Sequence, residues 1–145
     1  MGRRPFEDAP GALWHVILAD TSVWIDFFRG TANPESLRLR EAVRQGEVCT
    51  CGMVVTEVLQ GLGDPRLRAR LQRELTLAFF LPMSFACHVL AAELYVSARA
   101  AGQTVRNTAD CVIAACAIWH EIPLLQRDRD FETLADVSGL RLAKV

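Results

Sequence analysis

Lysine is almost absent from the chain: Lys144 is the only one among 16 basic residues, and the others are arginine. With 17 acidic residues the formal net charge is −1, which excludes the broad excess of positive charge that many nucleic-acid-binding proteins carry. Arginine suits bidentate recognition of phosphate. A GC-rich coding sequence produces the same bias, however, and is the simpler explanation.

The sequence also lacks a segment suited to a membrane. No apolar run reaches the ~20 residues needed to span a bilayer, and the first residues contain acids and a proline where a signal peptide needs an apolar core. Cysteine occurs five times, without zinc-type spacing, at positions 49, 51, 87, 111 and 116. An odd number of cysteines, several in apolar runs, favours a reducing compartment over a disulfide framework. We therefore expect a cytoplasmic protein.

Several common kinds of site have no counterpart in the sequence. A glycine-rich phosphate loop is missing, and no serine lies in a nucleophile elbow. His15, His88 and His120 are scattered, and none has a metal-binding companion three or four residues away. These absences argue against phosphate-loop enzymes, serine hydrolases and histidine-based metal centres.

The length and the apolar content predict one domain. The chain has 145 residues, of which 51% are hydrophobic, enough for a substantial core. Residues 1–15 match nothing in the organisation that follows. We predict that they form an N-terminal arm, either disordered or an over-extended start, and that residues 16–145 form a single domain.

Strands and helices alternate along that domain. The apolar pattern predicts strands at 16–19, 47–50, 79–83, 122–126 and 140–145. It predicts helices between them, ending or beginning at Gly and Pro signals, at 23–30, 34–44, 53–62, 65–78, 85–101 and 109–120, with a helical turn at 130–134. Thr21 or Ser22 is the predicted cap of the first helix. This order predicts an α/β fold with a parallel sheet between helices.

Four acidic residues follow strands or open helices in this scheme. Asp20 and Asp128 come after the first and fourth strands, Glu57 lies on the helix after the second, and Asp110 is in the first turn of the apolar helix 109–120. Ligands of parallel sheets bind beyond the carboxyl ends of the strands. Carboxylates gathered there repel one another unless cations lie among them. Hard divalent ions such as Mg²⁺ or Mn²⁺ are the natural partners.

Each acid also has an ordinary alternative. Asp20 can be an N-cap, Glu57 a solvated helix residue, and Asp110 a first-turn acid favoured by the helix dipole. Asp128 and Asp130 can pair with the neighbouring arginines at 127 and 129, an arrangement worth ~0–1 kcal/mol. Four separate explanations at strand ends and first turns are less economical than one shared site.

Three blocks in order, ADTSVWID, TEVLQGL and TADCVIAACAIWHEIPLLQRDRDF, resemble the PIN-domain ribonuclease family, specifically VapC-type toxins of prokaryotic toxin–antitoxin pairs. The resemblance implies a three-layer α/β/α PIN-like domain whose central parallel sheet has four to five short strands. It also implies a Mg²⁺- or Mn²⁺-dependent endoribonuclease that hydrolyses RNA phosphodiester bonds with metal-activated water.

The resemblance transfers site residues one by one. The four family acids correspond to Asp20, Glu57, Asp110 and Asp128, of which Asp20, Asp110 and Asp128 are the expected metal ligands. Glu57 and Asp130 are auxiliary candidates; the alternative for Asp130 is to cap the turn at 130–134. Thr21 matches the hydroxyl beside the first acid.

The resemblance also implies partners, namely an RNA substrate, a cognate VapB-like antitoxin and a second copy in a homodimer. Arg99 and Arg106 flank the helix break at Gly102, shortly before Asp110, and are candidates for contact with RNA phosphate. Their alternative is to be solvated residues at helix ends.

Two other functions compete with the nuclease. A non-catalytic PIN-fold RNA-binding or regulatory module is expected to lose one or more of the acids, and all four positions are filled. A phosphoacceptor domain of the response-regulator kind needs a lysine after a late strand. Lys144, the only lysine, lies in the last predicted strand beside the chain end, which argues against that function.

Overall fold

The computed structural model describes residues 15–145, so the predicted arm lies outside the described residues except for His15. A parallel sheet of four short strands forms the centre, in the order β3-β2-β1-β4. The strands are β1 (Ile17–Ala19), β2 (Val48–Cys51), β3 (Phe79–Leu81) and β4 (Leu124–Leu125). Leu18 pairs with Cys49 of β2 on one side and with Leu124 of β4 on the other, which fixes the register.

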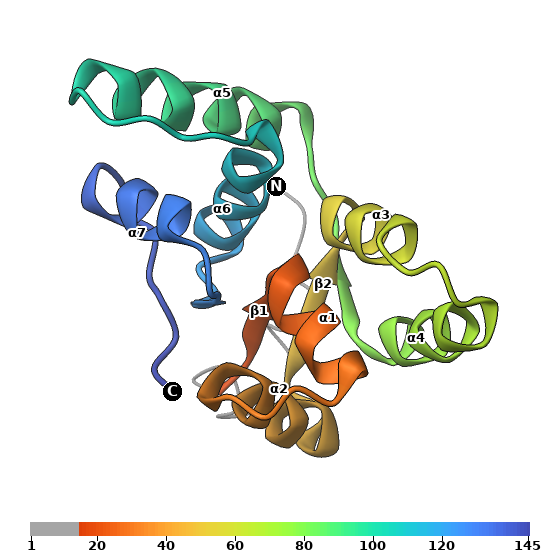
Figure 1. Cartoon of the computed structure of the whole chain (residues 1–145). Coiled ribbons are helices and arrows are strands. Elements are labelled where there is room, and N and C mark those ends of the chain that lie inside the picture. Colours follow the sequence, from red (N-terminus) through yellow and green to blue (C-terminus); the bar gives the residue numbers. More distant parts are fainter. Residues whose placement is uncertain (1–14) are drawn as a thin grey trace, which may run out of the picture.

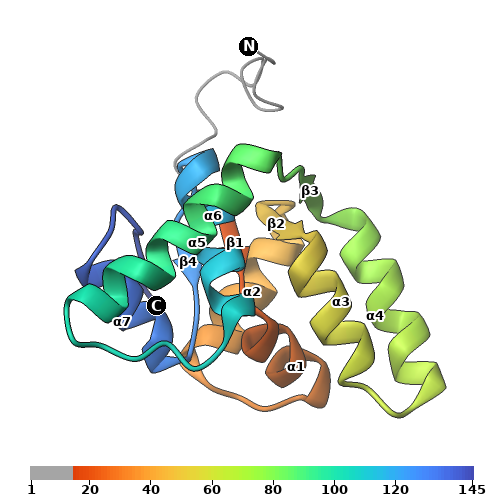
Figure 2. The ribbon, with the colours of Figure 1, turned by 90° about the horizontal axis from the view of Figure 1, so that it is seen from above.

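Seven helices surround this sheet within the described residues. They are α1 (Thr21–Arg29), α2 (Pro34–Gln45), α3 (Gly52–Gln60), α4 (Pro65–Leu77), α5 (Phe85–Ala100), α6 (Thr108–His120) and α7 (Arg129–Asp136). Helices α5, α6 and α7 pack together, whereas α1 packs against α2 and α3, and α4 extends beside α3 (Figures 1 and 2). The predicted three-layer α/β/α fold with a central parallel sheet is confirmed.

Burial explains why these segments form a core. Strands β1 and β2 are buried at every residue, as expected for parallel strands covered on both faces. Helix α6 is buried continuously from Ala109 to Ala117, which confirms the central position that its apolar composition predicts. All five cysteines are buried free thiols. Within residues 15–145, no helix is both long enough and apolar enough to cross a membrane.

The predicted cap of the first helix is wrong and the alternative, Asp20, is confirmed; the alternative that made Asp130 a cap is wrong. Asp20, not Thr21 or Ser22, caps α1: its Oδ1 accepts a hydrogen bond from the Val23 N–H at 3.1 Å. The helix begins at Thr21, so the residue that keeps an extended backbone is Asp20 (φ −75°, ψ 172°). The turn expected at 130–134 is a longer helix, α7, and its cap is Asp128 rather than Asp130.

The predicted last strand at 140–145 is also corrected. Only one bridge, between Leu124 and Leu142, joins this segment to the sheet. Strand β4 has only two residues, so it offers a neighbour too few backbone groups for a longer ladder.

The path of the chain sets where a site can lie. From β1 the chain adds β2 and β3 on one side, then crosses back to place β4 on the other side of β1. The strand order therefore reverses between β1 and β4. Open parallel sheets bind ligands at such a reversal, beyond the carboxyl ends of the strands.

Candidate functional site

The residues that follow β1 and β4 meet at this reversal. Asp20 comes directly after β1, and its backbone N–H donates to the Leu125 carbonyl at 3.0 Å. Asp128 follows β4 by three residues and caps α7. The first turn of α6 adds Asp110, and α3 adds Glu57. The topology thus directs four acids from separate segments toward one end of the sheet.

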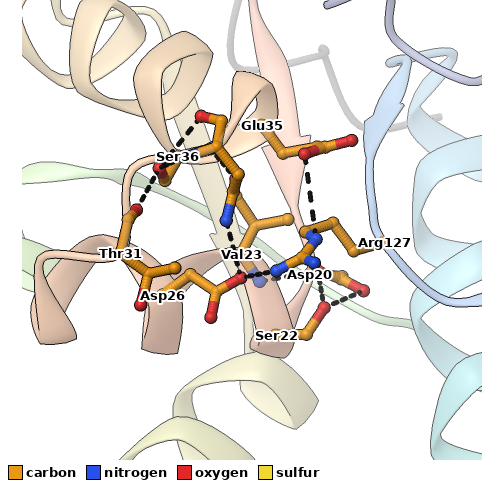
Figure 3. Close-up of polar contacts among 9 residues, drawn as sticks. Asp20, Ser22, Val23, Asp26, Thr31, Glu35, Ser36 and Arg127 are labelled. Atoms are coloured by element: carbon orange, nitrogen blue, oxygen red, sulfur yellow. Dashed lines mark hydrogen bonds and ion pairs between the residues drawn. The ribbon is translucent and has the colours of Figure 1, made fainter.

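Asp20 is buried in spite of its charge, with 3% of its surface exposed. The Ser22 hydroxyl donates to both of its carboxylate oxygens, at 3.0 and 3.1 Å, and the Val23 N–H donates to one (Figure 3). Burial nevertheless raises the pKa of Asp20 from 3.8 to about 6, against these hydrogen bonds and with a contribution from the negative charge of Asp128. Capping α1 therefore does not fully stabilise the ionised form.

Asp110 shows the same effect more strongly. Its pKa rises from 3.8 to about 7, first because of burial and then because of the charges of Asp128, Asp130, Glu57 and Asp20. Among residues 15–145, none donates a hydrogen bond to its carboxylate. The repulsion that Asp110 experiences from the other four acids places all five in one electrostatic group.

Three members of this group are close enough to share an ion. Asp110, Asp128 and Asp130 each offer a carboxylate oxygen, and these oxygens lie within 4.8 Å of one another. Carboxylate oxygens are the donors that Mg²⁺ and Mn²⁺ prefer. Burial first, and repulsion from the other acids second, raise the pKa values of Asp20 and Asp110, and a bound cation would offset both effects. The donor set therefore fits a hard divalent cation.

Among residues 15–145, one arginine, Arg106, contacts the acids through its guanidinium, and Arg127 reaches Asp20 through a backbone hydrogen bond. The Arg106 Nη2 donates to Asp128 Oδ1 at 2.8 Å, its Nε donates to Asp130 Oδ1 at 3.3 Å, and its backbone N–H donates to Asp130 Oδ2 at 3.0 Å. Arg99 does not join them: its guanidinium stacks on Tyr95, 5.9 Å from the ring centroid. There it lines a separate cavity of about 390 Å³ beside Gly102.

The two hydroxyls of the first block serve different acids. Thr21 Oγ1 donates to Glu57 Oε1 at 3.0 Å and so joins α1 to α3. Ser22 serves Asp20, a contact that sequence reasoning missed. The signal was present, because a hydroxyl two residues after an acidic N-cap lies over the same helix start.

The arginine pairings also differ from the sequence-based alternative. Arg127 does not pair with Asp128 or Asp130; its guanidinium contacts Asp26 on α1 and Glu35 on α2, the latter at 3.8 Å (Figure 3). The partner of Asp128 and Asp130 is instead Arg106, which lies in a loop more than twenty residues away in sequence. Nothing local in the sequence indicates this partnership.

Comparison with known proteins agrees with the fold. Residues 17–137 match the PIN domain family. VapC ribonuclease Mb1587 of Mycobacterium bovis and ribonuclease VapC11 of Mycobacterium tuberculosis are each 34% identical to the chain over 131 residues, covering 88% of this chain and 98% of the relative.

Solved structures of similar fold share less sequence. VapBC2 from Rickettsia felis, bound to a promoter DNA fragment, matches with a TM-score of 0.68 at 16% identity, covering 88% of this chain and 97% of that one. FitAB bound to a DNA fragment matches with a TM-score of 0.70 at 22% identity, covering 88% and 94%. These likenesses establish the fold alone. The match over residues 17–137, together with the 34% identical relatives, shows that the chain belongs to the PIN domain family.

Proposed function

We propose that the protein is a metal-dependent endoribonuclease, the VapC-type toxin of a toxin–antitoxin pair, acting in the cytoplasm. The observation that carries this proposal is the gathering of five carboxylates at the reversal of strand order, where Arg106 supplies the one guanidinium in contact with them among residues 15–145. The 34% identical relatives, which are named VapC ribonucleases, support the same activity. A non-catalytic RNA-binding module has less support, because each of the four family acids has its counterpart here.

Asp20, Asp110 and Asp128 are the proposed ligands of Mg²⁺ or Mn²⁺, with Glu57 and Asp130 as auxiliary acids. When bound, the cation makes water a better nucleophile and neutralises charge that develops on the phosphodiester. The oxygen spacing supports Asp110 and Asp128 and groups Asp130 with them, whereas Asp20 is not one of these three residues. Asp20 remains a proposed ligand from the family resemblance and from its charge repulsion with Asp110.

The other side chains position the acids. The Ser22 hydroxyl and the Val23 N–H fix both oxygens of Asp20, so its carboxylate keeps one orientation. Thr21 does the same for one oxygen of Glu57. Positioning of this kind lowers the entropy that is lost when the reacting groups come together. We assign no role at the acids to Arg99, because its guanidinium lies on Tyr95.

A homodimer and an antitoxin complete the proposal. Helix α5 exposes Phe85, Val89 and Val96, with Ala92 between them, at the alternating spacings of four and three residues that suit packing against another helix. Exposed apolar surface of this kind marks an interaction site. The VapBC2 and FitAB structures contain antitoxin–toxin pairs, which supports a VapB-like partner for this chain.

The test is RNA cleavage by the purified chain with and without divalent metal. We expect EDTA to abolish cleavage, and Mn²⁺ or Mg²⁺ added in excess to restore it. The Asp20→Asn variant, purified in parallel, controls for contaminating ribonuclease and is expected to be inactive under every condition. Cleavage that persists in EDTA, or that is equal in the variant, would contradict the proposal.

A further inference from the structure

Arg106 differs from the other arginines near the acids in touching two of them. Its guanidinium bridges Asp128 and Asp130, two of the three residues whose oxygens lie within 4.8 Å of one another. We propose that Arg106 is a resident cation of the acidic site: it holds Asp128 and Asp130 until a divalent ion displaces its guanidinium, which then turns to the RNA phosphate. The inference rests on the metal-dependent function proposed above.

Charge and shared atoms make the two cations competitors. The Arg106 Nη2 donates to Asp128 Oδ1 at 2.8 Å. A metal ion bound by Asp128 would therefore share that carboxylate with the arginine. A guanidinium and a divalent cation a few ångströms apart repel each other, even where solvent screens part of the repulsion. Occupancy by one therefore weakens the binding of the other, and the coupling is reciprocal.

The exposure of the partners indicates which contacts can be released. The Arg106 side chain is 68% exposed, so it can swing outward without opening the core, whereas the Asp130 side chain is only 7% exposed. The Arg106 backbone N–H also donates to Asp130 Oδ2 at 3.0 Å, and this bond does not depend on where the guanidinium points. The displaced guanidinium thus remains tethered beside the acids.

A displaced arginine at this place suits the substrate. Guanidinium groups bind phosphate oxygens through two parallel hydrogen bonds, as they bind carboxylates. When the divalent ion binds Asp128, Arg106 loses a negatively charged partner, and the phosphodiester of the RNA can replace it. Arg106 is therefore placed to exchange a carboxylate partner for a phosphate partner once the metal is bound.

The closing experiment measures Mn²⁺ binding alone, by isothermal titration calorimetry on the full chain without RNA. We expect Arg106→Gln to tighten Mn²⁺ binding about tenfold, within the usual range of coupling between competing ligands. Arg106→Lys keeps the positive charge but loses the forked guanidinium. Its Mn²⁺ affinity is expected to lie between those of Arg106→Gln and the parent. The matched control is Arg129→Gln, which removes the same charge from an exposed residue between Asp128 and Asp130. It is expected to change affinity less than about twofold.

A second measurement needs no variant. In proton–nitrogen NMR spectra of the parent protein, the Arg106 Nε–H resonance is expected to shift on titration with diamagnetic Mg²⁺, because the bond to Asp130 breaks. A resonance unchanged at saturating Mg²⁺ would overturn the inference, as would unchanged or weaker Mn²⁺ binding by a folded Arg106→Gln variant. Equal tightening by Arg129→Gln would also overturn it, because general electrostatics would then suffice. If neither the parent nor the variant binds Mn²⁺, the proposed metal centre itself fails.

Discussion

Two neighbouring groups of charges in this protein are built differently. In the first, Arg127 contacts Asp26 and Glu35 (Figure 3). The Asn33 side chain also donates to Asp26 at 3.1 Å, so both carboxylates have partners. In the second, Arg106 is the one arginine of the described chain whose guanidinium contacts the five carboxylates. The pKa of Asp110 rises to about 7 there, first because of burial and then because of the other acids.

The difference separates an arrangement that stabilises the fold from one that does not. The Arg127 group ties the segment after β4 to α1 and α2 and requires no further ligand. The second group leaves Asp110 buried with no cationic partner among residues 15–145, although the chain is rich in arginine. Uncompensated charge of this kind lowers stability and is retained where a function needs it.

The largest expected effect comes from Asp110→Asn. RNA cleavage should fall about a thousandfold or more, because a metal ligand is lost. In EDTA at pH 8 the variant should be more stable than the parent by about 0.5–2 kcal/mol, since a repelled charge is removed. Cleavage assays and thermal unfolding in parallel measure both effects. A variant that loses stability but keeps cleavage would show that Asp110 belongs with the structural charges.

The second effect is a dependence of stability on pH. The folded protein raises the pKa of Asp110 from 3.8 to about 7, so between these values it holds a proton that the unfolded chain releases. The metal-free parent should therefore gain stability as the pH falls from 8 toward 6, and lose it as the pH rises through 7. Unfolding in EDTA at several pH values measures this; Asp110→Asn should lose about 1 kcal/mol of the gain. Equal slopes in the two proteins would contradict the raised pKa.

The charges around Arg127 should show the opposite behaviour. Asp26→Asn removes one carboxylate of the paired group and is expected to lower the free energy of unfolding by about 1 kcal/mol or less. RNA cleavage should not change, because Asp26 does not contact the five-acid group. Denaturant unfolding together with cleavage kinetics tests this. A marked loss of cleavage in a stable variant would remove the distinction between the two groups.

The smallest effect is expected at the amino end. Deletion of residues 1–14 should change neither the unfolding midpoint nor the cleavage rate, because the domain predicted from the sequence begins at residue 16. In the shortened chain, Asp26→Asn and Asp110→Asn should have the same effects on stability and cleavage as in the full chain. A shortened chain that fails to fold would show that this segment belongs to the core.

The sequence predicted the fold well where the signal is local. Buried strands appear in the sequence as short apolar runs. Gly30, Pro34 and Pro65 mark helix ends through backbone preferences that act within a few residues. The prediction of a strand at 140–145 was wrong, because the pairing of this segment depends on the length of β4, which lies elsewhere in the chain. Ladder formation is a property of two strands, whereas an apolar pattern describes one.

The site divides in the same way. The positions of Asp20 and Asp128 follow from strand ends in a parallel sheet, which a sequence can indicate. The bridging by Arg106 depends on how the loop before α6 folds back over α7, more than twenty residues away. Roles for these residues in metal and RNA binding stay predictions until the experiments above are done.

The continuous burial of α6 has a consequence for how such a protein can diversify. Asp110 lies on α6, which is buried continuously from Ala109 to Ala117, so packing on all sides holds its backbone in place. The stretch that joins α5 to α6 lies outside that constraint, except at the buried Val105 and at Arg106, which contacts two of the acids. Changes that alter the choice of RNA can therefore accumulate at the other positions of this loop while the acids keep their places.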